Sequence, residues 1–481
     1  MKKTSFFYKI IKALVRFFYP FTEVFGEENL PKEPCIVVAN HCQMNGPIAC
    51  ELYFPGKHYT WCAAEMMRTR DVPAYAYKDF WSNKPIYIRW FFKLASYIIA
   101  PLASHVFNNA NCIAVYRDLR MRNTFRETLE KLEAGSNIII FPEHDGDYDY
   151  IINDFQDRFI DIAAIYHRRT GKDLSFVPVY IAAHIGRIQI GEAVRFNNDA
   201  PKTEERQRVK DVLMQRISAI ARSLPEHRVV PYRQTPKAVC PSSLTGNPYG
   251  FFRKPVVDYR QMRLNNLKDK RFSHVRLLVG WVFYFIMYML TEKLIPESAC
   301  HVVHCALDDI IPFNEYFLIF YCAWYFWIFF SLVYFLAYDI DSFKRLQTFF
   351  IIVQAGAMIV YIVYPTIQLG RPESFERNNF FTWLMSQIYA FDTPTGVCPS
   401  LHVAYSIGIA ESWIRRKKTT GFWKFFNAVL CFMVSISVCF VKQHSAVDIL
   451  AAIPLSVIAD VLIYEKIGGR RTLLQKWLDK V

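Results

Sequence analysis

Apolar residues follow two different patterns along this chain. In the first half they form short runs that alternate with amphipathic stretches of helical period, such as Arg122 to Ala134. Short apolar runs separated by helical patterns predict β-strands in an α/β domain. We expect strands at Cys35–Ala39, Asn111–Tyr116, Asn137–Phe141 and Ser175–Ile181.

The second half contains much longer apolar runs, which predict membrane-spanning helices. Several are shorter than the ~20 residues of a straight span, so their flanks must contribute. The sequence therefore predicts an α/β domain followed by an all-α six-span transmembrane bundle. We expect the spans near Leu277–Leu290, Phe317–Tyr338, Phe349–Tyr364, Val403–Trp413, Phe425–Val441 and Ile449–Tyr464.

Two further apolar stretches are interrupted by basic residues. In Ser5–Tyr19 the apolar residues recur at helical period, with Lys9, Lys12 and Arg16 on the other face. This pattern predicts a helix lying in the membrane interface, or a surface helix packed on the next domain. The stretch from Pro85 to Val106 predicts a helix that dips into the interface without spanning it.

These patterns divide the chain into four parts. The Pro-containing, basic third part lacks long periodic stretches and predicts a linker. The expected parts are an amphipathic interfacial helix at 1–29, an α/β domain at 30–224, a linker at 225–271 and a six-span domain at 272–481.

Composition favours a membrane rather than nucleic acid as the partner of this basic chain. Of 481 residues, 53% are hydrophobic, and the net charge of +14 comes from Lys and Arg that flank apolar segments. The twelve cysteines form no Cys-x-x-Cys pair, so no disulfide framework or zinc ribbon is indicated. The Cys300–Cys305 cluster matches no common metal spacing, and the acidic run Asp145–Asp149 lacks the EF-hand pattern. We expect no metal.

Charge also predicts the orientation of the spans. Basic loops favour the cytoplasmic side, and three such loops fall on one side of the bundle together with the linker and the first domain. The loops that hold Arg371, His402 and His444 then face the extracytoplasmic side. The three basic loops are Lys344-Arg345, Arg415–Lys418 and Arg470-Arg471.

Two histidines lie at the edges of apolar runs, where an ionisable side chain is costly without a role. Asp448 follows His444 by four residues, so both share one helix face and the carboxylate can orient the imidazole. His402 comes from a separate segment, as a general acid would. The guanidinium of Arg371 is suited to binding phosphate.

In this order, Arg371-Pro372, Pro399-Ser400-Leu401-His402 and His444-x-x-x-Asp448 resemble the type 2 phosphatidic acid phosphatase superfamily. The Pro-Ser-Leu-His form is most similar to its branch of inositol phosphorylceramide and sphingomyelin synthases. The resemblance implies that His444 becomes a phosphohistidine, that Asp448 orients it, that His402 protonates the leaving group and that Arg371 holds the phosphate.

The same resemblance assigns Ser400 to substrate binding, and it has two departures. Val438 stands where many members carry an Arg, six residues before the nucleophile, and Lys442 is the candidate for that charge. Tyr364 replaces the Lys that usually precedes Arg-Pro. Water or an alcohol could accept the phosphoryl group.

Four pieces of the first half resemble the glycerolipid acyltransferase family: Asn40-His41, Arg117, Phe141-Pro142-Glu143 and Val177-Pro178-Val179. The resemblance implies acyl transfer from a thioester, acyl-CoA or acyl carrier protein, to the hydroxyl of a lysophospholipid such as 1-acylglycerol-3-phosphate. His41 would be the general base, Arg117 would hold the phosphate and Glu143 would help bind the acceptor. No bound cofactor is expected.

The first half also departs from its family. Gly46 stands where the family has Asp, five residues after the His, and Asn45 is the nearest residue that could orient His41. An Asn oxygen cannot stabilise an imidazolium by charge. Two hypotheses follow for a multi-pass membrane enzyme of glycerolipid metabolism. Its first domain is either an acyltransferase or an inactive lipid-binding or docking module. A transporter or receptor built on six spans is a third hypothesis.

Overall fold

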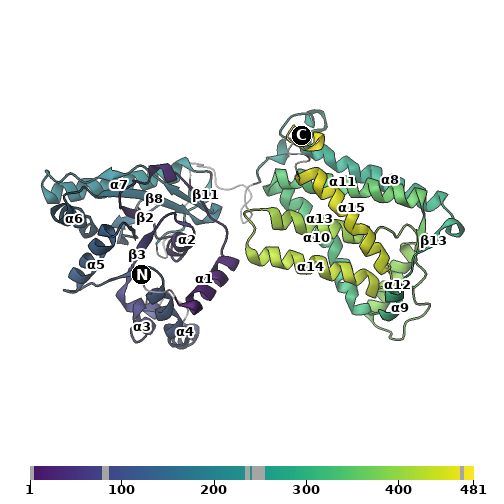
Figure 1. The fold of residues 1–481 in the computed structure, drawn as a ribbon, viewed down its shortest axis with the longest axis horizontal. Helices are drawn as coiled ribbons and strands as arrows, with labels where there is room; N and C mark the ends of the chain where they lie inside the picture. The colour runs from purple at the N-terminus through teal and green to yellow at the C-terminus, as the bar shows by residue number, and fades with distance from the viewer. Residues whose placement is uncertain (1–4, 79–85, 233–238, 241–254, 466–470, 481) are drawn as a thin grey trace. The chain divides into compact units, whose positions relative to one another are not determined.

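The computed structural model describes residues 5–78, 86–232, 239–240, 255–465 and 471–480. The chain divides into two compact units, Met1–Gly246 and Asn247–Val481, called unit 1 and unit 2 below (Figure 1). Part of the predicted linker, 233–238 and 241–254, lies outside the described residues.

Unit 1 is built on an eight-stranded mixed sheet, and all four predicted strands belong to it. The strand order is β1-β9-β8-β2-β5-β3-β4, with β10 paired to β8. The strands from β8 to β4 in this order are parallel to one another. Their bounds are β1 Glu23–Phe25, β2 Ile36–Ala39, β3 His58–Ala63, β4 Cys112–Val115, β5 Asn137–Ile140, β8 Ser175–Ala182, β9 Arg187–Ile190 and β10 Val194–Arg195.

Alternating side chains bury both faces of this sheet. On β2, Ile36 and Val38 pack into a core that α5, α6 and α7 cover, and Val37 and Ala39 pack into a second core with α2. A small hairpin of β6 and β7 follows β5. The bounds are α2 Asn45–Tyr53, α5 Met121–Glu133, α6 Ile162–Thr170, α7 Lys202–Ser223, β6 Glu143–Tyr148 and β7 Asn153–Phe155.

The predicted amphipathic helix is α1, Phe6–Phe18. It packs on unit 1 through Tyr8 and Lys12, which both hydrogen-bond Glu51, and it exposes Phe6, Phe7, Ile10, Leu14 and Phe18. It lies beside α4, Arg89–Asn109, the stretch predicted to dip into the interface. By length and composition, α4 is also apolar enough to cross a membrane.

Unit 2 is helical, and each predicted span corresponds to a helix. Among the described residues, six helices are long and apolar enough to span a membrane: α4 and five helices of unit 2. The chain thus has the helices of a multi-pass membrane protein. The bounds are α8 Val279–Leu294, α9 Ala306–Ile310, α10 Leu318–Tyr338, α11 Ile340–Val363, α12 Phe380–Phe391, α13 Leu401–Arg415, α14 Gly421–Phe440, α15 Ala446–Tyr464 and α16 Leu473–Leu478.

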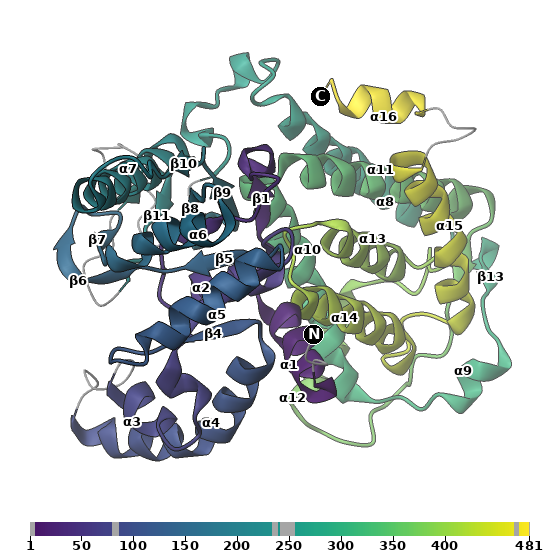
Figure 2. The same cartoon turned by 60° about the vertical axis from the view of Figure 1, so that its left-hand side comes forward.

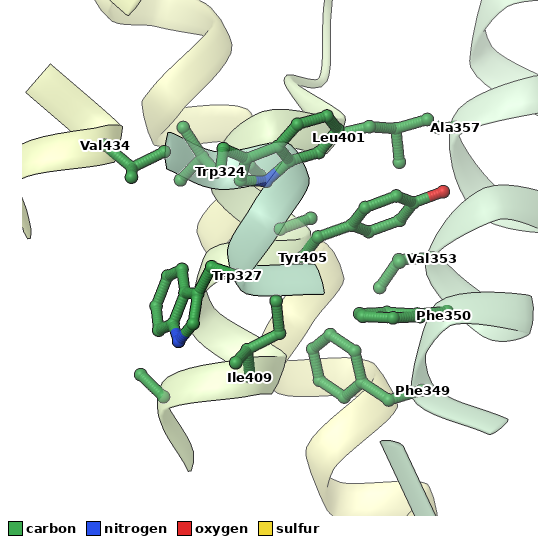
Figure 3. Close-up of a cluster of buried hydrophobic side chains, with 14 of the residues drawn as sticks. Trp324, Trp327, Phe349, Phe350, Val353, Ala357, Leu401, Tyr405, Ile409 and Val434 are labelled. Atoms are coloured by element: carbon green, nitrogen blue, oxygen red, sulfur yellow. The ribbon is translucent and has the colours of Figure 1, made fainter. Parts of the chain in front are cut away.

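The predicted fourth span, α13, differs from the others. It has 15 residues, so it covers about 22 Å, less than the ~30 Å of a bilayer's hydrocarbon core. It packs against α10, α11, α14 and α15 (Figure 2). Gly408 permits this, because a Cβ there would lie 2.4 Å from the Phe349 ring. Figure 3 shows the core around it, where Tyr405 and Ile409 of α13 lie among aromatic rings of α10 and α11.

Candidate functional site

His444 and Asp448 form a pair at the start of α15 in unit 2. The Nδ1 of His444 lies 3.1 Å from Oδ2 of Asp448, which also accepts the backbone N–H of Ser445 at 2.9 Å. Because an ionised carboxylate only accepts hydrogen bonds, the proton of a neutral His444 is on Nδ1 and the lone pair is on Nε2. Asp448 is completely buried.

His402 reaches this pair from the first turn of α13. Its Nδ1 lies 3.4 Å from Nε2 of His444, so the fold brings together two histidines 42 residues apart. The His402 ring stacks on Tyr321 and Trp324 of α10, with ring centroids 4.7 and 4.1 Å away. These ring contacts fix the orientation of the His402 imidazole, in which Nδ1 lies toward His444.

Arg371 is tied to the same loop. Its terminal nitrogens donate to the carbonyls of Asp392 at 2.7 Å and Thr393 at 3.2 Å, and to the side-chain oxygen of Gln443 at 2.5 Å. Gln443 directly precedes His444, so the guanidinium adjoins the loop that carries the proposed nucleophile.

Three nitrogens of this cluster are buried without a hydrogen-bond partner among the described residues. They are Nε of Arg371, Nε2 of His402 and the amide nitrogen of Gln443. Buried polar groups are nearly always paired, so each such nitrogen calls for an explanation. The nitrogens of Arg371 and Gln443 are donors, and that of His402 donates when its ring carries both protons. An anionic group with several acceptor oxygens is the ligand that such donors suit.

The remaining predicted residues of unit 2 make structural contacts. The hydroxyl of Ser400 caps α13 by accepting the N–H of Val403, and the Ser400 N–H donates to the Asp448 carbonyl at 3.1 Å. The ammonium of Lys442 donates to the carbonyls of Asp308 and Ile311 at 2.8 and 2.6 Å. Binding of substrate by Ser400 and Lys442 stays a prediction.

Basic residues occupy the other end of these helices. Both α13 and α15 begin beside the histidines, and at their far ends the guanidinium of Arg415 lies 4.5 Å from the ring centre of Tyr464. Arg345 of α11 lies over the same ring at 5.4 Å. Within unit 2, the candidate site and these arginines are thus at opposite ends of shared helices, and the side of the membrane on which each end lies stays a prediction.

In unit 1, His41 and Glu143 meet at the carboxyl edge of the sheet. They follow β2 and β5, which are parallel neighbours. One oxygen of Glu143 accepts the backbone N–H of His41 at 2.6 Å, and the other accepts the N–H of Asn153 at 2.8 Å. In this structure, Glu143 therefore holds the loop that carries His41.

The buried Glu143 predicts a pH-dependent stability. Burial raises the pKa of Glu143 from 4.5 to about 7, although the N–H groups of Asn153 and His41 act to lower it. The folded state then binds a proton more tightly than the unfolded state, so this stability is fully present below pH 4.5 and is lost as pH rises through 7. Between these two pH limits, the free energy of unfolding changes by on the order of 3 kcal/mol through this group.

We expect the Tm of the full chain to fall with rising pH more steeply for wild type than for Glu143→Gln. Thermal unfolding between about pH 5 and about pH 8 measures this difference. Equal slopes for the two proteins would mean that Glu143 is ionised throughout this range.

The imidazole of His41 is held by a backbone carbonyl. Its Nδ1 contacts the carbonyl oxygen of Gln43, which places the proton on Nδ1 and the lone pair on Nε2. Cys42 and Gln43 both have positive φ, 49° and 56°, and this backbone turns the carbonyl toward the ring. The Cys42 thiol and the Asn40 amide bind the backbone of Ile181 on β8 and fix the loop.

At position 46, where the acyltransferase family that the sequence resembles has Asp, backbone atoms leave no room for a side chain. A Cβ at Gly46 would lie 2.5 Å from the carbonyl oxygen of His41 and 2.9 Å from that of Asn40. We expect Gly46→Asp to lower the stability of the chain by about 1–3 kcal/mol, measured as a fall in Tm, rather than to complete the site. Gly46→Ala is the matched variant, because it adds the Cβ without the charge and should lose stability as well. A Gly46→Asp variant as stable as wild type would contradict this expectation.

Two other predicted residues of unit 1, Asn45 and Arg117, have different positions relative to His41. Asn45 begins α2, and its side chain donates to the Cys42 carbonyl at 3.2 Å, so it supports the loop. Arg117 is exposed just after β4, at the same sheet edge as His41. Since β4 is three strands from β2, about 14 Å of sheet edge separates them, and phosphate binding by Arg117 stays a prediction.

Three contacts at these sites were not predicted from sequence. They are the Gln43 carbonyl at His41, the Gln443 amide at Arg371, and the Asp308 carboxylate at the loop of His444. Asp308 carried a sequence signal, since Asp308-Asp309 is an acidic pair in a loop between two apolar runs.

No family model matches the chain. No curated protein matches it either. Among solved structures, the 1-acyl-sn-glycerophosphate (LPA) acyltransferase PlsC from Thermotoga maritima is similar, with 19% identity and a TM-score of 0.29, over 47% of this chain and 86% of that chain. A likeness at this level identifies no family for the chain.

Proposed function

We propose that unit 2 cleaves or transfers a lipid phosphoester through a phosphohistidine on His444. The observation that carries this proposal is the contact of His444 with Asp448 on one side and His402 on the other. A histidine oriented by a carboxylate, with a second histidine at its reactive nitrogen, has the parts of nucleophilic catalysis with general acid assistance.

In the proposed reaction, Nε2 of His444 attacks phosphorus and the bond from phosphorus to the leaving oxygen breaks. His402, in its imidazolium form, gives the proton on Nδ1 to that oxygen, so the leaving group departs as an alcohol. Water or a second alcohol then attacks the phosphohistidine and gives its proton back to His402. In this reaction phosphorus and the leaving oxygen lie between the two nitrogens, which are 3.4 Å apart in this structure and must therefore separate when substrate binds.

Two of the partnerless nitrogens support a phosphate at this place. Those of Arg371 and Gln443 can each donate to a phosphoryl oxygen, and charge neutralisation by positioned donors is the main source of catalysis in phosphoryl transfer. The proposed substrate is a membrane lipid, since unit 2 consists of helices long and apolar enough to span a bilayer. By the charge rule, we place this site at the extracytoplasmic face and unit 1 in the cytoplasm.

For unit 1 we propose acyl transfer from a thioester to the hydroxyl of a lysophospholipid, with His41 as general base. The observation in favour is the contact of Nδ1 with the Gln43 carbonyl, which puts the lone pair on Nε2. A base at this nitrogen would take the hydroxyl proton as the oxygen attacks the thioester carbonyl. Acyl-CoA or acyl carrier protein would supply the acyl group.

The alternative for unit 1 is a lipid-binding or docking module without activity. It is favoured by Gly46, because no carboxylate stands where an imidazolium would need charge stabilisation. A transporter built from the same spans would leave the His444–Asp448–His402 arrangement without a role.

One reaction panel tests these proposals together. The purified full chain is mixed with phosphatidic acid, phosphatidylinositol, phosphatidylcholine or lysophosphatidic acid, each with and without acyl-CoA, and mass spectrometry follows phosphate and new lipids. Turnover of a phosphoester supports the function proposed for unit 2. Acylation of lysophosphatidic acid supports that of unit 1. A panel without either product would overturn both.

A further inference from the structure

The short helix α9 precedes α10, more than 130 residues before His444 in the chain, yet it contacts the His444 loop directly. Its Asp308 is 8% exposed. One carboxylate oxygen of Asp308 accepts the N–H of Ala446 at 2.8 Å. The other accepts the hydroxyl of Ser445 at 2.5 Å and the N–H of Cys305 at 2.9 Å. Three donors thus converge on one buried carboxylate.

Lys442 makes a second connection between the same two segments. Its ammonium donates to the backbone carbonyls of Asp308 and Ile311. Lys442 itself has a φ of +50°, a left-handed conformation that is uncommon for a non-glycine residue. The bonds to Asp308 and Ile311 anchor its side chain and so help to hold this backbone turn, two residues before His444.

These bonds reach the reactive pair through Ser445. The Ser445 hydroxyl donates to Asp308, and the Ser445 N–H donates to the oxygen of Asp448 that also contacts Nδ1 of His444. Ser445 is thus held from two sides, by Asp308 through its hydroxyl and by Asp448 through its N–H. Burial acts to raise the pKa of Asp308, but the bonds from Ser445, Ala446 and Cys305 hold that pKa below its usual value, so Asp308 is ionised at neutral pH.

We propose that Asp308, with Lys442, is a positioning group that fixes His444 and Asp448 in the geometry needed for attack on phosphorus. The inference rests on the function proposed for unit 2. It also gives Lys442 a role different from the phosphate contact predicted from sequence. Because α9 and the His444 loop come from opposite ends of unit 2, this bond also links formation of the site to folding of the whole unit.

Asp308→Asn tests the proposal, and the neighbouring Asp309→Asn is its matched control. Asp309 lies on the same helix, but its side chain is 69% exposed and binds His304. The purified full chain is mixed in detergent with each of three ³²P-labelled lipids in turn: phosphatidic acid, phosphatidylinositol and phosphatidylcholine. Rapid quenching under alkaline conditions, in which phosphohistidine survives, follows the label on the protein.

We expect the rate constant of labelling to fall about 10- to 100-fold in Asp308→Asn while the amplitude is kept, because a small misplacement of a reacting group has effects of this size. Asp309→Asn should behave as wild type. A merely structural role would lower the amplitude, which counts folded protein, and leave the rate constant unchanged.

Three other results would overturn the inference in distinguishable ways. Equal rate constants in wild type and Asp308→Asn would remove the inference and leave the function of unit 2 standing. An equal fall in both variants would show a general effect of charge on α9. Absence of label from wild type with all three lipids would overturn the proposed function, and the inference with it.

Lys442→Met should lower the rate constant without raising KM. A raised KM at an unchanged rate constant would make Lys442 a substrate ligand instead.

Discussion

Replacing His444 by Ala is expected to lower the turnover of a lipid phosphoester by about 10⁴-fold or more. The variant removes the nitrogen that would bond to phosphorus, and loss of a nucleophile removes most of the catalysis that its partners support. Asp448→Asn should have a smaller but still large effect, about 10³-fold, because an Asn in this place no longer fixes the proton on Nδ1 of His444. Both are measured as phosphate release or new lipid formed by the purified full chain.

The control for this prediction is His304→Ala. His304 lies in the loop before α9, its side chain is 49% exposed and it binds Asp309 rather than the site. It tests whether loss of any surface imidazole of unit 2 matters. If His444→Ala kept more than about a tenth of wild-type turnover, the phosphohistidine would be excluded and the activity would belong to another group.

Four of the eight strands of the sheet and most of the helical unit could be predicted from sequence, because their apolar periods are clear. Strands β2, β5 and β8 are continuous apolar runs, as parallel strands covered on both faces must be. Strand β3, His58–Ala63, was not predicted, since its run His-Tyr-Thr-Trp-Cys-Ala mixes polar and apolar residues. This strand is stabilised by its pairing with β4 and β5, which its own sequence pattern does not indicate.

The burial of α13 could not be predicted from its hydrophobicity. Val403–Trp413 was predicted as a span, but the helix is buried on most sides, and Gly408 lets the Phe349 ring of α11 approach closely. Helix burial of this kind depends on partners far away in the sequence. The pattern gave the identity of the helix and not its surroundings.

For the candidate sites, sequence predicted a contact that follows from helix period. The pair of His444 and Asp448 follows from the four-residue spacing. The contact of Glu143 with the His41 backbone depends on β2 and β5 being parallel neighbours, an order that the sequence pattern did not predict. The contact of Asp308 with Ser445 joins segments 137 residues apart, and no local pattern contains it. At Gly46 the sequence shows only the missing acid, whereas the structure shows backbone atoms that leave no room for a side chain.

Replacing His41 by Ala is expected to lower acyl transfer to lysophosphatidic acid by about 10²–10⁴-fold, the usual contribution of a general base. The measured quantity is the rate at which the full chain forms phosphatidic acid from acyl-CoA. His167→Ala is the matched control, because His167 lies in the same unit on α6, with a side chain that is 40% exposed and bound to Asp173 at 3.0 Å.

The form of the pH profile separates the two hypotheses for unit 1. A histidine acts as a general base only after it has lost its proton, so acylation that depends on His41 should rise with pH up to a plateau. That rise should disappear in His41→Ala together with the rate. If wild type acylates and His41→Ala acylates equally fast with the same pH profile, the chemistry does not occur at this histidine. If wild type forms no phosphatidic acid under conditions in which unit 2 turns over its lipid, unit 1 is a binding module, and the backbone atoms beside Gly46 explain why position 46 cannot supply a carboxylate.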